Sequence, residues 1–247
     1  MKHLAVILSL ALSMMTAAEA AELKLIAGGS LAGLFGELGP QFEKATGHRL
    51  AIHFDSTPNI IARVNSGTPF DIVVVPIDVF KDATAKGHFV EGSIVDIARV
   101  GYGVIVRAGA PKPDISTSDA FRKALLDAKS VASVPASAAG AYIAKVYERL
   151  GIGEEMKAKT RAQQVPTAIA PTVANGEAEL GIFLASVFIS PGVEPIGPFP
   201  ADLQQELAFT AAIAVDTREA GAAKALIDYL KTPAAIAMIK AAGMTPG

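Results

Sequence analysis

Small hydroxyl residues and glycines stand where the sequence predicts the carboxyl ends of two strands. A Gly-Gly-Ser segment at residues 28–30 follows an apolar run at 23–27, and an Asp-Ser-Thr segment at 55–57 follows a second run at 50–54. Open α/β sheets place ligands at this end of their strands, and a helix that starts there offers free N–H groups to an anion. One such turn alone often serves only to connect strand and helix. Because there are two, we predict an anion site made of neutral donors, which suit a fully ionised oxyanion.

The sequence comes close to several enzyme and metal-site signatures but matches none of them. Residues 28–32 nearly match the nucleophile elbow of α/β-hydrolases, but Ser30 follows the first strand and no late histidine can act as its base. Residues 28–33 also lack the spacing of a dinucleotide-binding or phosphate-binding loop. His48 and His53 have no acidic partner at metal spacing, so we interpret them as surface or strand residues. We expect no enzyme activity, metal or cofactor; a secreted serine hydrolase using Ser30 stays open as an alternative.

Length, charge and the N-terminus limit the class of protein. The 247 residues allow one large or two small α/β domains, and the net charge of −2 provides no basic face for nucleic acid. The chain has no cysteine, which removes disulfides and thiolate metal sites. Residues 1–20 combine a basic start, an apolar run at 4–15 and Ala-Glu-Ala at 18–20, as signal peptides do. We expect cleavage after Ala20 and a soluble protein in the periplasm.

The remaining chain alternates predicted strands and helices, which is typical of a parallel sheet. Two Gly-rich crossings between two α/β sets suggest a hinged pair with a cleft. We therefore predict two doubly wound α/β domains joined by a two-segment hinge, with domain 1 at residues 21–102 and 208–247 and domain 2 at 103–207. The expected strands are 23–27, 50–54, 71–75, 100–107, 131–134, 178–183 and 207–215. The expected helices start at residues 31, 58, 117, 135, 167, 216 and 233. We expect Ser30 to cap the helix that starts at Leu31, a break in that helix at Gly39-Pro40, a capping box at 216–219 and a cap at Thr232.

A series of short motifs runs through nearly the whole mature chain. They are Ala27-Gly28-Gly29-Ser30-Leu31, the stretch 54–71, Ala139-Gly140 with Tyr142, Leu150-Gly151, Leu180-Gly181-Ile182 and the stretch 228–233. In this order and spacing they resemble the periplasmic molybdate-binding proteins of ABC importers, a branch of the type II periplasmic binding fold. The resemblance implies a monomer that captures molybdate or tungstate between two domains and delivers it to an ABC permease in the inner membrane.

The resemblance also implies which residues hold the ligand. The ligand serine falls on Ser30, the second hydroxyl on Thr57 and the backbone donor of the second domain on Ala139, with Gly29 and Ser56 beside them.

Three positions depart from the family. A backbone donor falls on Pro166, which has no N–H, so Thr167 is expected to replace it. The ligand tyrosine falls on Leu184, which cannot donate, and Asp55 stands where the family has a small neutral residue. Asp55 shares a strand face with Thr57, so its carboxylate either approaches the ligand or caps the helix near residue 58. A protonated oxyanion or a small organic acid therefore stays open as the ligand.

Overall fold

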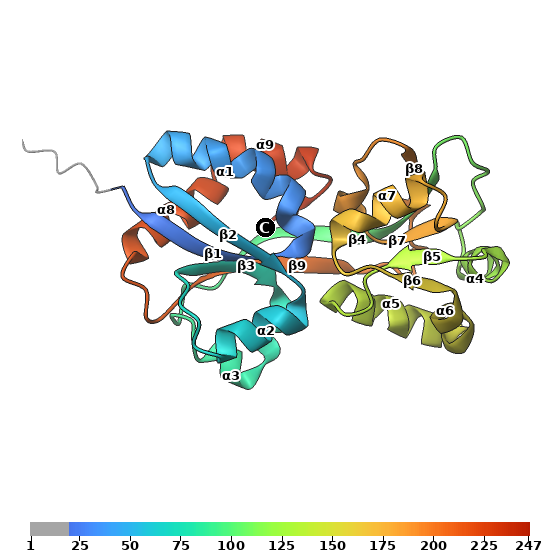
Figure 1. The fold of residues 1–247 in the computed structure, drawn as a ribbon, viewed down its shortest axis with the longest axis horizontal. Coiled ribbons are helices and arrows are strands. Elements are labelled where there is room, and N and C mark those ends of the chain that lie inside the picture. The colour runs from blue at the N-terminus through green and yellow to red at the C-terminus, as the bar shows by residue number, and fades with distance from the viewer. Residues whose placement is uncertain (1–19) are drawn as a thin grey trace, which may run out of the picture.

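The structure is a computed structural model that describes residues 20–247. The signal peptide expected at residues 1–20 lies outside the described residues, except for Ala20. Figure 1 shows an elongated molecule in which the long strands β4 and β9 run between two groups of strands and helices. The strands are β1 Glu22–Gly28, β2 Arg49–Asp55, β3 Ile72–Pro76, β4 Val95–Arg107, β5 Val131–Ser133, β6 Thr160–Ala162, β7 Leu180–Leu184, β8 Val193–Pro198, β9 Glu206–Ile213 and β10 Thr245–Pro246.

Nine α-helices and four short 3-10 turns connect the strands within residues 20–247. The first strand group consists of β1, β2 and β3 with the adjoining parts of β9 and β4. In Figure 1, α1, α8 and α9 cover one face of this group and α2 and α3 cover the other. The helices are α1 Ala32–Thr46, α2 Thr57–Asn65, α3 Ala83–Lys86, α4 Ser118–Asp127, α5 Ala138–Arg149, α6 Gly153–Lys159, α7 Ile169–Ala174, α8 Ala220–Leu230 and α9 Pro233–Ala241, and the 3-10 turns are η1 Gly29–Leu31, η2 Ile77–Lys81, η3 Pro166–Ala168 and η4 Ala185–Phe188. None of these helices is long and apolar enough to cross a membrane.

The sheet confirms the α/β class but is mixed rather than purely parallel. Its order is β2-β1-β3-β9-β4-β7-β5-β6, with β8 and β10 also paired to β4. The expected parallel pairing holds for β1 with β2 and β3, and for β5 with β6 and β7. β9 lies antiparallel between β3 and β4. A strand from late in the chain therefore completes the first group.

β4 belongs to both strand groups. Its residues 95–101 pair with β9, while residues 102–106 pair with β7. At this change the Gln204 side chain acts as a strand partner: its Oε1 accepts from the Tyr102 N–H at 3.0 Å and its Nε2 donates to the Tyr102 carbonyl at 2.9 Å. The partition into domains at 102/103 and 207/208 stays a prediction, and it coincides with this exchange of partners.

The starts of α1 and α8 and one expected break differ from the sequence-based prediction, and α5 begins at Ala138 rather than at residue 135. α1 begins at Ala32, after η1, so Ser30 is not its cap, and it continues through Pro40 without the expected break. Leu38 and Phe42 are fully buried on either side of Pro40, and this packing outweighs the hydrogen bond that proline cannot make. α8 begins at Ala220 rather than at the predicted capping box.

The reason for the late start of α8 lies in a threonine of the predicted capping box. The Thr217 hydroxyl donates to the Asp71 carboxylate at 2.7 Å and accepts from the Glu219 N–H at 2.9 Å. Residues 217–219 therefore form a turn that is tied to the end of another loop. The cap predicted for α9 is confirmed, since the Thr232 hydroxyl accepts from the Ala235 N–H.

Candidate functional site

A small cavity lies where β1, β2 and β5 end and α5 begins. Its volume is about 20 Å³, which is room for roughly one water molecule. Six of the seven residues predicted for the ligand site line this cavity, namely Gly29, Ser30, Asp55, Ser56, Thr57 and Ala139. The structure thus brings together residues that are more than 100 positions apart in the sequence.

Thr167 is the predicted residue that does not line the cavity. It faces an adjoining groove of about 610 Å³, which it shares with Ser30. Pro166 occupies the position on the cavity wall instead, because its ring packs against Gly29 across the cleft. A Cβ atom on Gly29 would come within 3.2 Å of the Pro166 ring. Thr167 is not placed to supply the donor that Pro166 lacks.

Space, rather than an unusual backbone angle, requires the glycines at the end of β1. Gly28 has φ −61° and ψ 135°, an ordinary extended conformation. A Cβ atom there would lie 3.0 Å from the Phe209 ring and 3.2 Å from the Pro76 ring. The close approach of β1 to these rings places the first turn of η1, with Ser30, at the mouth of the cavity.

The start of α5 contacts the start of α2 directly. The Ala138 N–H donates to the Thr57 hydroxyl at 3.3 Å, and the Gly140 N–H donates to the Ser137 hydroxyl at 2.9 Å. Among the hydrogen bonds of residues 20–247, none uses the Ala139 N–H, although Ala139 is 2% exposed. Ala139 lines the cavity, and its first-turn N–H is therefore a donor without a protein partner there.

Asp55 lines the cavity and is held from three sides. Its Oδ1 accepts from the Ser56 N–H at 2.7 Å and from the Asn59 side chain at 2.8 Å. Its Oδ2 lies 3.3 Å from His53 Nε2. Ser56 is the N-cap of α2, and no side chain caps this helix. The idea that Asp55 serves only as the cap of α2 therefore has no support in this geometry.

His53 agrees with the interpretation as a surface or strand residue, whereas His48 does not. His48 is buried, and its Nδ1 accepts from the Ala21 N–H at 3.2 Å, which fixes the start of β1. His53 lies on β2 and pairs with Asp55. Neither ring bonds to Ser30, so the described residues give no support to Ser30 as an activated nucleophile. No cluster of metal-ligating side chains occurs within residues 20–247.

Sequence reasoning missed the apolar wall of the cavity. Phe183 lines the cavity, whereas its neighbour Leu184 does not, because successive strand residues point to opposite faces. Alternation along residues 180–184 could have located Phe183. Phe209 could not be found this way, since nothing local reveals where β9 enters the sheet. The apolar residues that line the cavity are Pro76, Val134, Ala138, Ala139, Pro166, Phe183, Leu207 and Phe209.

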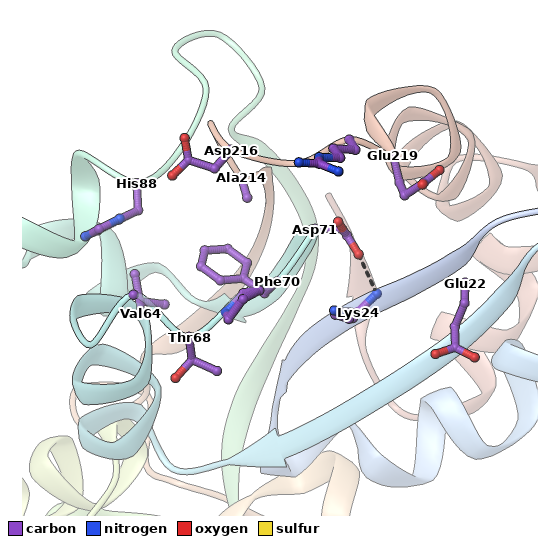
Figure 2. Close-up of a pocket in the computed structure, with 13 residues that line it drawn as sticks. Glu22, Lys24, Val64, Thr68, Phe70, Asp71, His88, Ala214, Asp216 and Glu219 are labelled. Atoms are coloured by element: carbon purple, nitrogen blue, oxygen red, sulfur yellow. Dashed lines mark hydrogen bonds between the residues drawn. The ribbon is translucent and has the colours of Figure 1, made fainter.

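A larger hollow of about 560 Å³ is lined by residues that include Lys24, Asp71 and Asp216. Figure 2 shows that its side chains carry both signs of charge and come from several elements. The Asp71 carboxylate accepts from the Lys24 N–H at 2.8 Å and from the Thr217 hydroxyl at 2.7 Å. The Asp71 carboxylate therefore has a structural role, because it links β1 to the turn at Thr217. We keep the smaller cavity as the candidate site.

The fold and the site define a class of extracellular binding protein. The chain belongs to the family of bacterial extracellular solute-binding proteins, whose model matches residues 23–245. It is 32% identical over 232 residues to an aconitate isomerase from a Pseudomonas species, covering 91% of this chain and 87% of that protein. It is 28% identical over 233 residues to the molybdate-binding protein ModA of Azotobacter vinelandii, covering 92% of this chain and 91% of ModA.

A solved structure supports the same fold. The periplasmic molybdate-binding protein of Azotobacter vinelandii superposes with a TM-score of 0.75 at 23% identity, covering 90% of this chain and 98% of that chain. The type II periplasmic binding fold predicted from the sequence motifs is confirmed.

Proposed function

We propose that this protein captures a small anion in the cavity between β1, β2 and α5 and delivers it to an ABC importer. The observation that carries the proposal is the meeting of two helix starts at one cavity. α2 and α5 both begin there, next to the hydroxyls of Ser30 and Thr57. Each helix start favours an anion by about 0.3–1 kcal/mol when exposed and up to ~2 kcal/mol when partly buried.

The first candidate ligand is molybdate or tungstate. Two observations support it: the relative ModA is a molybdate-binding protein, and Ser30, Thr57 and Ala139 provide neutral donors at the cavity. A small organic acid is the second candidate. It is supported by the Asp55 carboxylate on the cavity wall, by the apolar residues opposite, and by the aconitate isomerase relative.

A thermal-shift panel tests the proposal. Molybdate, tungstate, sulfate, phosphate and trans-aconitate are each added to the mature chain, and at least one is expected to raise the Tm. A ligand at 100 times its Kd stabilises the folded state by about 2.7 kcal/mol. Ser30→Ala should reduce the shift, whereas Thr68→Val, which removes a hydroxyl bonded to Ser66 on the surface, should not. No shift with any of these anions would contradict the proposal.

Opening and closure of the two predicted domains are part of the proposal, because the cavity as it stands has room for about one water molecule and must widen to hold an anion. The hydrogen bond from Ala138 to Thr57 joins residues of the two predicted domains, and an anion at the cavity would lie beside it. The periplasmic location, cleavage after Ala20 and the monomeric state stay predictions, and the expectation that the chain is not an enzyme is untested.

Ala138→Pro is expected to weaken closure while keeping the fold. Ala138 is the first residue of α5, where proline is tolerated, and Ser137 before it has the extended conformation that precedes proline (φ −151°, ψ 165°). The substitution removes the N–H that bonds to Thr57. Small-angle scattering should show a smaller radius of gyration on ligand addition for the parent and a reduced change for the variant. Equal changes at ligand saturation would show that this bond does not hold the closed form.

A further inference from the structure

A carboxylate and an imidazole form a pair that reaches from the cavity wall toward solvent. Asp55 Oδ2 and His53 Nε2 are 3.3 Å apart, and their side chains are 28% and 43% exposed. Both residues lie on β2, the outermost strand of the sheet order. The two hydrogen bonds to Oδ1, from Ser56 and Asn59, fix the carboxylate and leave Oδ2 with lone pairs free.

Binding of a fully ionised anion does not account for this pair. A carboxylate within about 4–6 Å of a bound anion disfavours it, and Asp55 does not cap α2. A fixed carboxylate beside donors for a negative charge is, however, the arrangement that a general base requires. The partly exposed His53 can exchange protons between Asp55 and water.

We infer that Asp55 is a catalytic base that moves a proton on a bound unsaturated carboxylic acid, with His53 as its positioning and proton-exchange partner. The inference rests on the proposed function, because it needs the acid's carboxylate to occupy the anion site. The substrate class is a small acid with a C–H bond next to both a carboxylate and a carbon–carbon double bond. The apolar wall, with Leu207 and Phe209, suits its carbon skeleton.

The proposed step conserves atoms and electrons. Asp55 Oδ2 takes the proton from the allylic carbon, and the electron pair of the broken C–H bond forms a new carbon–carbon double bond. The electrons of the original double bond move toward the carboxylate. The N–H and O–H donors of Ala139 and Ser30 stabilise the resulting dienolate. The proton, or one exchanged through His53, then returns to the other end of the three-carbon unit. The double bond has moved, and nothing has been oxidised or reduced.

The experiment follows proton exchange on trans-aconitate in deuterated water. Proton NMR should show the methylene signal disappearing and the cis isomer appearing in the presence of the parent protein. Asp55→Asn keeps an oxygen acceptor for Ser56 but cannot act as a base, and should slow exchange about 100-fold to 10,000-fold. Asp78→Asn is the matched control, since Asp78 pairs with Lys81 on η2, and should exchange at the parental rate.

His53 is tested by chemical rescue. His53→Ala should slow exchange about tenfold, and added imidazole should restore part of the rate, which a purely structural defect would not allow. His88→Ala, at the hollow of Figure 2, is the matched control and should need no rescue.

Two results overturn the inference while leaving the anion-binding proposal intact. One is a thermal shift with trans-aconitate without any deuterium exchange; the other is an unchanged exchange rate in Asp55→Asn. Failure of every anion to bind would instead remove the proposed function itself, and the inference with it.

Discussion

Gly140→Ala is expected to destabilise the protein by about 3 kcal/mol or more. A Cβ atom at Gly140 would lie 2.1 Å from the Val134 carbonyl oxygen and 2.5 Å from that of Pro135. Both are backbone atoms, so no side-chain rotation can relieve the overlap. Urea unfolding of parent and variant measures the change in the free energy of unfolding.

Gly36→Ala is the matched control for this substitution. Gly36 also lies in a helix, α1, and a Cβ atom there would meet nothing within 4 Å. It should stabilise the protein by up to about 1 kcal/mol, because alanine favours the helix more than glycine does. If Gly140→Ala unfolded within 1 kcal/mol of the parent, the start of α5 would not be packed on residues 134–135 as described.

The second large effect is expected at Asp55. Asp55→Ala should strengthen the binding of molybdate, which has no proton to donate, because it removes a like charge beside the anion. It should weaken the binding of protonated phosphate, which loses an acceptor. Each change is about 1–3 kcal/mol, so the ratio of the two affinities should shift by roughly 30-fold or more.

Calorimetric titration of both ligands into parent and variant checks this prediction. Asp78→Ala serves as the control for the loss of a carboxylate from the same strand group. Equal changes in affinity for molybdate and phosphate would contradict a role of Asp55 in ligand choice. A lower free energy of unfolding with an unchanged order of affinities for molybdate and phosphate would show that Asp55 has only a structural role.

The polar part of the candidate site could be predicted because it depends on local features. Ser30 and Thr57 follow strands β1 and β2, which are adjacent and parallel, so their carboxyl ends meet. The shared face of His53 and Asp55 follows from strand alternation. However, the predicted strand face was that of Asp55 and Thr57, whereas β2 ends at Asp55 and Thr57 begins α2. The pairing of Asp55 with His53 was not predicted.

Features that depend on distant parts of the chain could not be predicted. The continuity of α1 through Pro40 depends on packing against the sheet, and local propensity opposes it. The turn at Thr217 depends on Asp71, which is 146 residues away in the sequence. The apolar wall depends on Phe209, and therefore on where β9 enters the sheet.

The position of β9 also governs when the fold can form. β3 and β4 are separated in the sheet by a strand that begins at Glu206, so the first strand group has a gap until that residue is available. Contacts between such distant segments slow folding, because a long loop must close first. A chain that ends before Glu206 would leave two apolar strand edges unpaired. The native sheet is therefore completed only after residues 206–213 have been synthesised.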